Sequence, residues 1–102
     1  MISFTILLIE DDQNVASFIR RGLEEQGNTV LQAFEGTTGL KLASQDHFDI
    51  IILDVIMPGI TGIEVCDTLK NEKNINTPIL LLTALGTTDD IVTGLQTGAD
   101  DY

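Results

Sequence analysis

The sequence predicts an α/β fold in which helices cover both faces of a parallel sheet. Short apolar runs alternate with longer segments of helical periodicity, which is the pattern of α/β proteins. Most of these runs show no polar alternation, as is typical of strands that are buried on both faces. The 102 residues are enough for one small domain, and no Pro/Gly/Ser-rich linker divides them. We therefore expect a single domain over residues 1–102.

Four apolar runs are the predicted strands. They are Ile6–Ile9, Val30–Leu31, Ile50–Leu53 and Ile79–Leu82. The first, third and fourth are continuous aliphatic runs, which predicts central positions in the sheet.

The segments between these runs carry the three- and four-residue spacing of helices. The first predicted helix extends from about Gln13 to Gln26, with Asp12 as its N-cap and Gly27 as its stop signal. A shorter helix contains Leu40 and Ala43. The other helical positions are Ile63, Cys66 and Leu69 after Thr61, and Ile91, Val92 and Leu95 after Thr87 or Thr88. The predicted order is therefore β-α-β-α-β-α-β-α.

Charge and composition narrow the classes of function. Sixteen acidic residues against five basic ones give a formal net charge of -11, which opposes binding to nucleic acid or to anionic membranes. No apolar run approaches the roughly 20 residues of a membrane helix, and no basic, apolar leader follows Met1, so we expect a soluble, cytoplasmic protein. Cys66 is the only cysteine and cannot form an internal disulfide, and His47 has no second His or Cys at metal-ligand spacing. We expect Cys66 to be structural and His47 to lie at the surface or in a cap.

Acidic residues follow two of the predicted central strands. Glu10-Asp11-Asp12 follows the first strand and Asp54 the third, while Thr83-Ala84 follows the fourth. Because the carboxyl ends of parallel strands meet at one edge of a sheet, we expect these residues to share a site.

A cluster of carboxylates at one edge would need a counter-charge. Two carboxylates about 5 Å apart repel by roughly 3 kcal/mol at an effective dielectric near 20, and a divalent ion relieves that repulsion. Oxygen ligands with room for water suit Mg²⁺, and a carboxylate beside the ion is placed to attack a phosphoryl donor and form an aspartyl phosphate. Taken singly, the acids are equally consistent with a solvated strand end, a helix cap at Asp12 and a loop cap at Asp54.

Four segments, in this order, resemble the receiver domain of two-component response regulators. They are Ile6–Asp12, Asp54–Gly62, Pro78–Ala84 and Gly98–Tyr102, so the resemblance covers nearly the whole chain. It implies a flavodoxin-like, doubly wound parallel sheet with strand order 2-1-3-4-5. It also implies a switch that accepts a phosphoryl group from the phosphohistidine of a sensor histidine kinase or phosphotransfer protein. Such a domain catalyses only its own phosphotransfer and dephosphorylation.

The resemblance assigns the metal and acceptor residues by position. Asp54 would be the phosphoacceptor. Mg²⁺ would be held by the side chains of Glu10, Asp11 and Asp54 and by the backbone carbonyl of Ile56.

The resemblance also assigns the residues that would respond to the phosphoryl group. Thr83 would bond a phosphoryl oxygen, Ala84 would be the small residue beside it, and Tyr102 would be the aromatic that changes rotamer when the threonine moves. Ile56 and Leu85 lie two positions after the acceptor and after the switch hydroxyl. Both are bulky and apolar where they would flank an attacking water, so we predict slow self-hydrolysis.

The family pattern continues beyond the position of Tyr102. It includes the rest of a fifth strand, a phosphate-pairing lysine next to a proline, and a fifth helix, so we predict a receiver domain that is incomplete at its C-terminus. The bare sheet edge of such a domain could be covered in a homodimer.

Three other functions share part of the pattern. A degenerate receiver that acts only as an interaction module fits the missing lysine. A Mg²⁺-dependent aspartyl-phosphate phosphatase generally has a second Asp two residues after the first, where this chain has Ile56. A flavodoxin-like cofactor binder needs a Ser/Thr/Gly phosphate loop after the first strand, where this chain has Glu10-Asp11-Asp12. The sequence therefore favours the switch.

Overall fold

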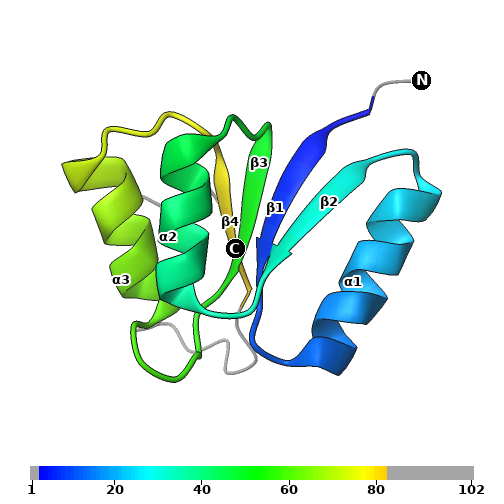
Figure 1. Cartoon of the computed structure of the whole chain (residues 1–102), viewed down its shortest axis with the longest axis horizontal. Helices are drawn as coiled ribbons and strands as arrows, with labels where there is room; N and C mark the ends of the chain where they lie inside the picture. Colours follow the sequence, from blue (N-terminus) through cyan, green and yellow to red (C-terminus); the bar gives the residue numbers. More distant parts are fainter. Residues whose placement is uncertain (1–2, 83–102) are drawn as a thin grey trace.

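The computed structural model describes residues 3–82, which form a parallel sheet with helices on both sides (Figure 1). The elements are β1 Thr5–Ile9, α1 Gln13–Glu25, β2 Thr29–Ala33, α2 Gly36–Gln45, β3 Ile50–Asp54, α3 Gly62–Asp67, a π-helical turn η1 Thr68–Glu72 and β4 Ile79–Leu82. The strand order is β2-β1-β3-β4 and every pairing is parallel. This confirms the predicted fold class and the order of its first four strands. The predicted fourth helix and fifth strand lie outside the described residues.

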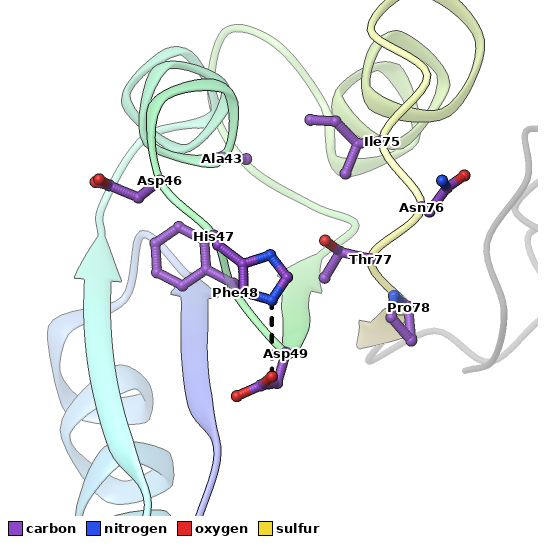
Figure 2. Close-up of a pocket in the computed structure, with 9 residues that line it drawn as sticks. All are labelled: Ala43, Asp46, His47, Phe48, Asp49, Ile75, Asn76, Thr77 and Pro78. Carbon is purple, nitrogen blue, oxygen red and sulfur yellow. Dashed lines mark ion pairs between the residues drawn. The ribbon is translucent and has the colours of Figure 1, made fainter.

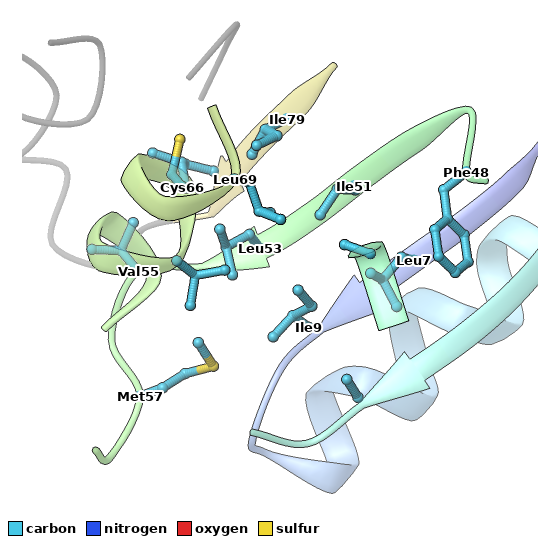
Figure 3. Close-up of a cluster of buried hydrophobic side chains, with 14 residues drawn as sticks. Leu7, Ile9, Phe48, Ile51, Leu53, Val55, Met57, Cys66, Leu69 and Ile79 are labelled. Carbon is cyan, nitrogen blue, oxygen red and sulfur yellow. The ribbon is translucent and has the colours of Figure 1, made fainter. Parts of the chain in front are cut away.

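Two apolar layers hold the helices on the sheet. Helix α1 packs on one face through Ala16, and helices α2 and α3 pack on the other face through Ala43 and Val65. Alternate strand residues face the two layers. On the α1 side lie Ile6, Leu8, Val30 and Ile52. On the α2 and α3 side lie Leu7, Ile9, Ile51 and Leu53 (Figure 3). Because both faces are covered, the continuous apolar runs of β1 and β3 are almost wholly buried, as predicted.

Local sequence signals set the ends of the helices. Asp12 caps α1, since its Oδ1 accepts the backbone N–H groups two and three residues further on, at 2.9 and 3.2 Å. Gly27 follows α1 with a φ of 92°, a conformation that glycine adopts without strain. Thr61 and Glu64 form a capping box at the start of α3. These caps confirm the predicted helix starts at Asp12 and Thr61 and the stop at Gly27.

The helix that begins after Thr61 differs from the prediction in its second half. The periodicity predicts one α-helix, but η1 follows α3, and the N–H of Lys73 donates to the carbonyl of Thr68 five residues earlier, at 2.9 Å. The Lys70 ammonium also donates to the carbonyl of Thr77 at 2.8 Å, which ties η1 to the segment that leads into β4. The wider turn is thus accompanied by a contact that the local sequence pattern does not reveal.

Strand β2 and the residues Cys66 and His47 bear on further sequence predictions. Strand β2 is longer than the predicted Val30–Leu31, because its register against β1 continues from Thr29 to Ala33. Cys66 is completely buried, and the side chain of His47 is 86% exposed, both as expected. No helix within residues 3–82 has the length and apolar content to cross a membrane.

Candidate metal centre

Three carboxylates meet where β1 and β3 end. Glu10 and Asp11 follow β1, and Asp54 is the last residue of β3. One carboxylate oxygen from each lies within 4.8 Å of the others. The sheet brings them together because β1 and β3 are neighbours, with Ile9 opposite Leu53 in the register. We call Glu10, Asp11 and Asp54 the acidic trio.

Glu10 is a buried acid, with only 5% of its surface exposed. Its backbone N–H donates to the carbonyl of Ala33 at 3.0 Å, and its Oε1 accepts the N–H of Asp12 at 3.1 Å. Burial raises the pKa of Glu10 to about 7; the N–H of Asp12 opposes this, and the charge of Asp54 adds to it. Without a cation, Glu10 therefore holds a proton for a large part of the time at neutral pH.

Asp54 is half-buried beside Glu10. Its Oδ1 accepts the N–H of Ile56 at 3.2 Å, and the N–H of Val55 bonds the carbonyl of Leu82 at 3.0 Å. Burial raises the pKa of Asp54, while hydrogen bonds from Ile56 and Glu10 lower it. The fold thus fixes one carboxylate oxygen of Asp54 and leaves the acid in surroundings that disfavour its charge.

Gly62 seats helix α3 against the backbone of Asp54. Its N–H donates to the carbonyl of Val55 at 3.0 Å. A Cβ at Gly62 would overlap the carbonyl oxygen of Asp54 and lie 2.7 Å from its carbonyl carbon. Gly62 belongs to the segment Asp54–Gly62 that resembles receiver domains, but its close packing on Asp54 was not predicted. The signal for it was a glycine directly after the predicted N-cap Thr61, where helix propensity alone gives no reason for one.

The donor set of the acidic trio fits a hard divalent cation. All three ligands are carboxylates, which are the oxygen donors that Mg²⁺ and Ca²⁺ prefer. The ion pairs that lie wholly within residues 3–82 join Arg20 to Glu24 and His47 to Asp49, so neither neutralises the trio. The side chain of Ile56, whose carbonyl the sequence analysis added to the set, is 52% exposed. The other predicted site residues, Thr83, Ala84, Leu85 and Tyr102, lie outside the described residues.

A hollow opens at the end of the sheet opposite the acidic trio. It has a volume of about 570 Å³ and is lined by residues between α2 and β3 and between η1 and β4 (Figure 2). Of its polar side chains, Asp49 accepts the backbone N–H of Thr5 at 2.8 Å and lies 3.9 Å from Nε2 of His47. The main partner of Asp49 is thus the backbone at the start of β1, which is a structural role.

Comparison with known proteins places the chain in a family. The sequence pattern of the response regulator receiver domain matches residues 6–102. The chain belongs to the response regulator receiver domain family. The response regulator ArlR of Staphylococcus haemolyticus is 43% identical to this receiver domain over 97 residues, covering 95% of this chain and 43% of that protein. The receiver domain is thus similar to part of a longer response regulator and spans less than half of its length.

Solved structures resemble the receiver domain over nearly its whole length. The receiver domain of the Francisella response regulator 1452 matches with a TM-score of 0.90 at 36% identity, over 97% of this chain and 81% of that one. A response regulator protein from Burkholderia pseudomallei, solved with a phosphorylated aspartic acid, calcium ion and citrate, matches with a TM-score of 0.87 at 31% identity. That match covers 96% of this chain and 57% of the other. The chain is therefore a signalling module of the two-component type.

Proposed function

We propose that this receiver domain is a cytoplasmic, phosphorylation-dependent switch in which Asp54 accepts a phosphoryl group in a Mg²⁺-dependent reaction. The main support for this proposal is the geometry of the acidic trio, in which one carboxylate oxygen from each residue lies within 4.8 Å of the others. The Burkholderia pseudomallei relative supports the proposal, because its structure combines a phosphorylated aspartic acid with a divalent cation.

Glu10, Asp11 and Asp54 would hold the ion together with the backbone carbonyl of Ile56. Mg²⁺ is usually bound by one or two carboxylates plus water and phosphate oxygens, so a half-open acidic site suits it. When bound, the ion would neutralise charge that the three acids and the phosphoryl oxygens bring together. Its charge would also favour the ionised forms of Glu10 and Asp54, whose pKa values burial raises.

The chemical step uses the carboxylate of Asp54 as a nucleophile. The N–H of Ile56 holds Oδ1, which leaves Oδ2 to attack the phosphorus of the donor. As the new O–P bond forms, the P–N bond of a phosphohistidine breaks. Its electron pair stays on the imidazole nitrogen, so the donor leaves as a histidine. The contact between Gly62 and the backbone of Asp54 keeps the acceptor at the strand end during this exchange.

The phosphoryl donor would be a sensor histidine kinase or a phosphotransfer protein. Helix α1 starts beside the acidic trio and carries Val15 and Phe18, which are 42% and 79% exposed. Apolar side chains this exposed beside a reactive acid favour docking of a protein over a purely small-molecule donor. Phe18→Ala should therefore slow transfer from a phosphorylated kinase and leave labelling by acetyl phosphate unchanged.

The output of the switch would come from the residues after β4. In the proposal, Thr83 bonds a phosphoryl oxygen, Ala84 leaves room beside it, and Tyr102 changes rotamer, so the added charge alters the surface. Ile56 and Leu85 would restrict access of water to the phosphoryl group and slow its loss. The domain would catalyse only its own phosphotransfer and dephosphorylation, and a homodimer is one form in which it could act.

The test is the intact mass of the chain after incubation with Mg²⁺ and acetyl phosphate. We expect one phosphoryl adduct on the unmodified chain, none on Asp54→Ala and none when EDTA replaces Mg²⁺. An adduct that persists in Asp54→Ala would overturn the assignment of the acceptor. If no adduct forms either on this chain or on a longer chain that carries the predicted phosphate-pairing lysine, the switch is wrong and a receiver that serves only as an interaction module is favoured.

A further inference from the structure

We infer that Ile9 and Gly39 form a size-matched pair that positions Glu10 for cation binding, which makes Gly39 a positioning residue of the metal centre. The inference rests on the proposed function, because it concerns the same acidic trio. Gly39 itself touches none of the three carboxylates. Its influence would pass through Ile9, the residue directly before Glu10.

Helix α2 contacts the end of β1. Gly39 lies in α2 directly against the side chain of Ile9. A Cβ at Gly39 would overlap Cδ1 of Ile9 and would lie 2.7 Å from its Cγ1 and 3.1 Å from its Cγ2. A side chain at position 39 would therefore require the side chain of Ile9 or helix α2 to move.

Ile9 has little room to yield. It is completely buried in the cluster on the α2 and α3 side of the sheet (Figure 3). Its side chain is branched at Cβ, which restricts rotation about χ1. Its backbone is paired on both sides, with Ala33 of β2 and Leu53 of β3. In a close-packed interior, an added methyl group therefore displaces neighbouring atoms.

Helix α2 is also restrained from moving outward. Gly36, one turn before Gly39, faces the loop that follows Asp54. A Cβ at Gly36 would overlap Cγ2 of Ile60 and lie 3.0 Å from Cγ2 of Val65. Tilting α2 away from Ile9 would therefore disturb its contact with the loop between Asp54 and α3, which carries the other half of the site.

At the end of β1, Glu10 is paired through its backbone on one side only, whereas Ile9 is paired on both sides. The ladder between β1 and β3 stops at Ile9, and Glu10 adds one backbone hydrogen bond, to the carbonyl of Ala33 at 3.0 Å. The side chain of Glu10 is held by the N–H of Asp12 at 3.1 Å. A displacement of Ile9 by a new Cβ at position 39 would therefore be passed to the end of β1, where it would shift Glu10 relative to Asp54.

The experiment measures the Mg²⁺ dissociation constant by calorimetry and the urea midpoint without Mg²⁺, both on the full chain. The variants are Gly39→Ala, Ile9→Val and their combination, since Ile9→Val removes the Cδ1 atom that a new Cβ would overlap. Gly22→Ala is the matched control, because Gly22 is also helical and has no atom within 4 Å of its Cβ position. It reports the effect of helix propensity alone.

We expect Gly39→Ala to weaken Mg²⁺ binding about tenfold, at the lower end of the range for residues that orient metal ligands. The double variant should recover part of that affinity, because it removes the overlap with Cδ1 while Cγ1 of residue 9 stays 2.7 Å from the new Cβ. Gly22→Ala should bind Mg²⁺ as the unmodified chain does. An unchanged affinity in Gly39→Ala, with only a lower urea midpoint, would mean that the pair is purely structural. A loss that Ile9→Val does not rescue would also overturn the inference.

One further comparison and one further variant keep the result interpretable. If Gly39→Ala alone does not fold, Ile9→Val becomes the reference, and adding Gly39→Ala to it should weaken Mg²⁺ binding by clearly less than about tenfold; a loss of about tenfold or more would contradict the size match. Glu10→Gln separates this inference from the proposed function. Binding of Mg²⁺ that is unaffected by Glu10→Gln would overturn the metal centre itself, whereas a loss there with unchanged binding in Gly39→Ala would overturn only the pair.

Discussion

Strand β3 has an aspartate at each end, and the two are in opposite situations. Asp49, just before the strand, is exposed, accepts the N–H of Thr5 at 2.8 Å and lies near His47. Asp54, the last residue of the strand, is half-buried among acids, and burial raises its pKa. The two aspartates thus differ in burial and in the like charges around them, which are the features that commonly mark functional carboxylates.

The largest expected effect tests this difference directly. Asp54→Asn should abolish the phosphoryl adduct formed with acetyl phosphate and Mg²⁺, because an amide oxygen is not a nucleophile of this kind. Asp49→Asn keeps an oxygen for the N–H of Thr5 and should leave the adduct in place. Intact mass spectrometry measures both. Equal labelling of the two variants would contradict the assignment of Asp54, and not Asp49, as the acceptor.

A second prediction concerns the backbone at the Asp54 end. Gly62→Ala should destabilise the domain by about 3 kcal/mol, the upper end of typical overpacking effects, because its Cβ would overlap the carbonyl oxygen of Asp54. Urea unfolding measures the change. Gly22→Ala is the control and should be slightly stabilising, since its Cβ meets open space. Equal stability of the two variants would contradict the close approach of α3.

A third prediction concerns the charge of Glu10, which lies beside Asp54 in the acidic trio. Because the pKa of Glu10 rises from 4.5 to about 7 on folding, the folded protein binds its proton more tightly than the unfolded chain does. Ionised Glu10 therefore contributes no destabilisation below about pH 4.5, and the destabilisation grows with pH to at most about 3 kcal/mol above pH 7. Glu10→Gln should thus stabilise the domain at pH 8 much more than at pH 4.5.

The measurement is the free energy of unfolding in urea at the two pH values, with and without Mg²⁺. Added Mg²⁺ should stabilise the unmodified chain at pH 8 and reduce its difference from Glu10→Gln. Glu25→Gln, at an exposed position of α1, serves as the control and should show no comparable pH dependence. A stabilisation by Glu10→Gln that is equal at both pH values would contradict the assigned pKa.

A fourth prediction concerns the lifetime of the phosphoryl group. The exposed, apolar side chain of Ile56 lies two residues after Asp54. Ile56→Asn should shorten the phosphoryl half-life several-fold, because a polar side chain there can orient an attacking water. Ile56→Leu keeps the bulk and should keep the half-life. Decay of the adduct mass with time measures both, and identical decay would contradict this role.

The smallest expected effect lies at the Asp49 end. His47→Gln should change stability by less than about 0.5 kcal/mol, because the imidazole is 86% exposed and its nitrogen is 3.9 Å from Asp49. Urea unfolding at pH 5.5 and pH 8 tests this. A large, pH-dependent loss would show that this end of β3 also carries a sensitive charge.

Much of the scaffold could be predicted, because each signal acts locally. The continuous apolar runs of β1 and β3 required cover on both faces, and Asp12 and Thr61 marked the helix starts through side-chain caps. The meeting of Glu10 and Asp54 followed from the geometry of parallel strands, which ends neighbouring strands at one edge.

The remaining features depend on contacts between distant residues. The turn η1 replaces α-helix where Lys70 reaches the carbonyl of Thr77, and residue periodicity does not encode that contact. The close approach of Gly39 to Ile9 likewise exists only once α2 is docked on the sheet. A sequence pattern predicts which face of a helix or strand a residue occupies. It does not predict how closely two elements pack against each other.

The hydrogen bond between the N–H of Gly62 and the carbonyl of Val55 has an entropic consequence. It closes the loop that begins directly after Asp54, and the buried side chain of Met57 anchors the same loop from inside. The segment beside the acceptor has therefore lost most of its conformational freedom when the protein folds. In the proposed transfer, a phosphoryl donor would meet a loop that is already ordered, so the encounter would carry little further ordering cost on the side of the receiver.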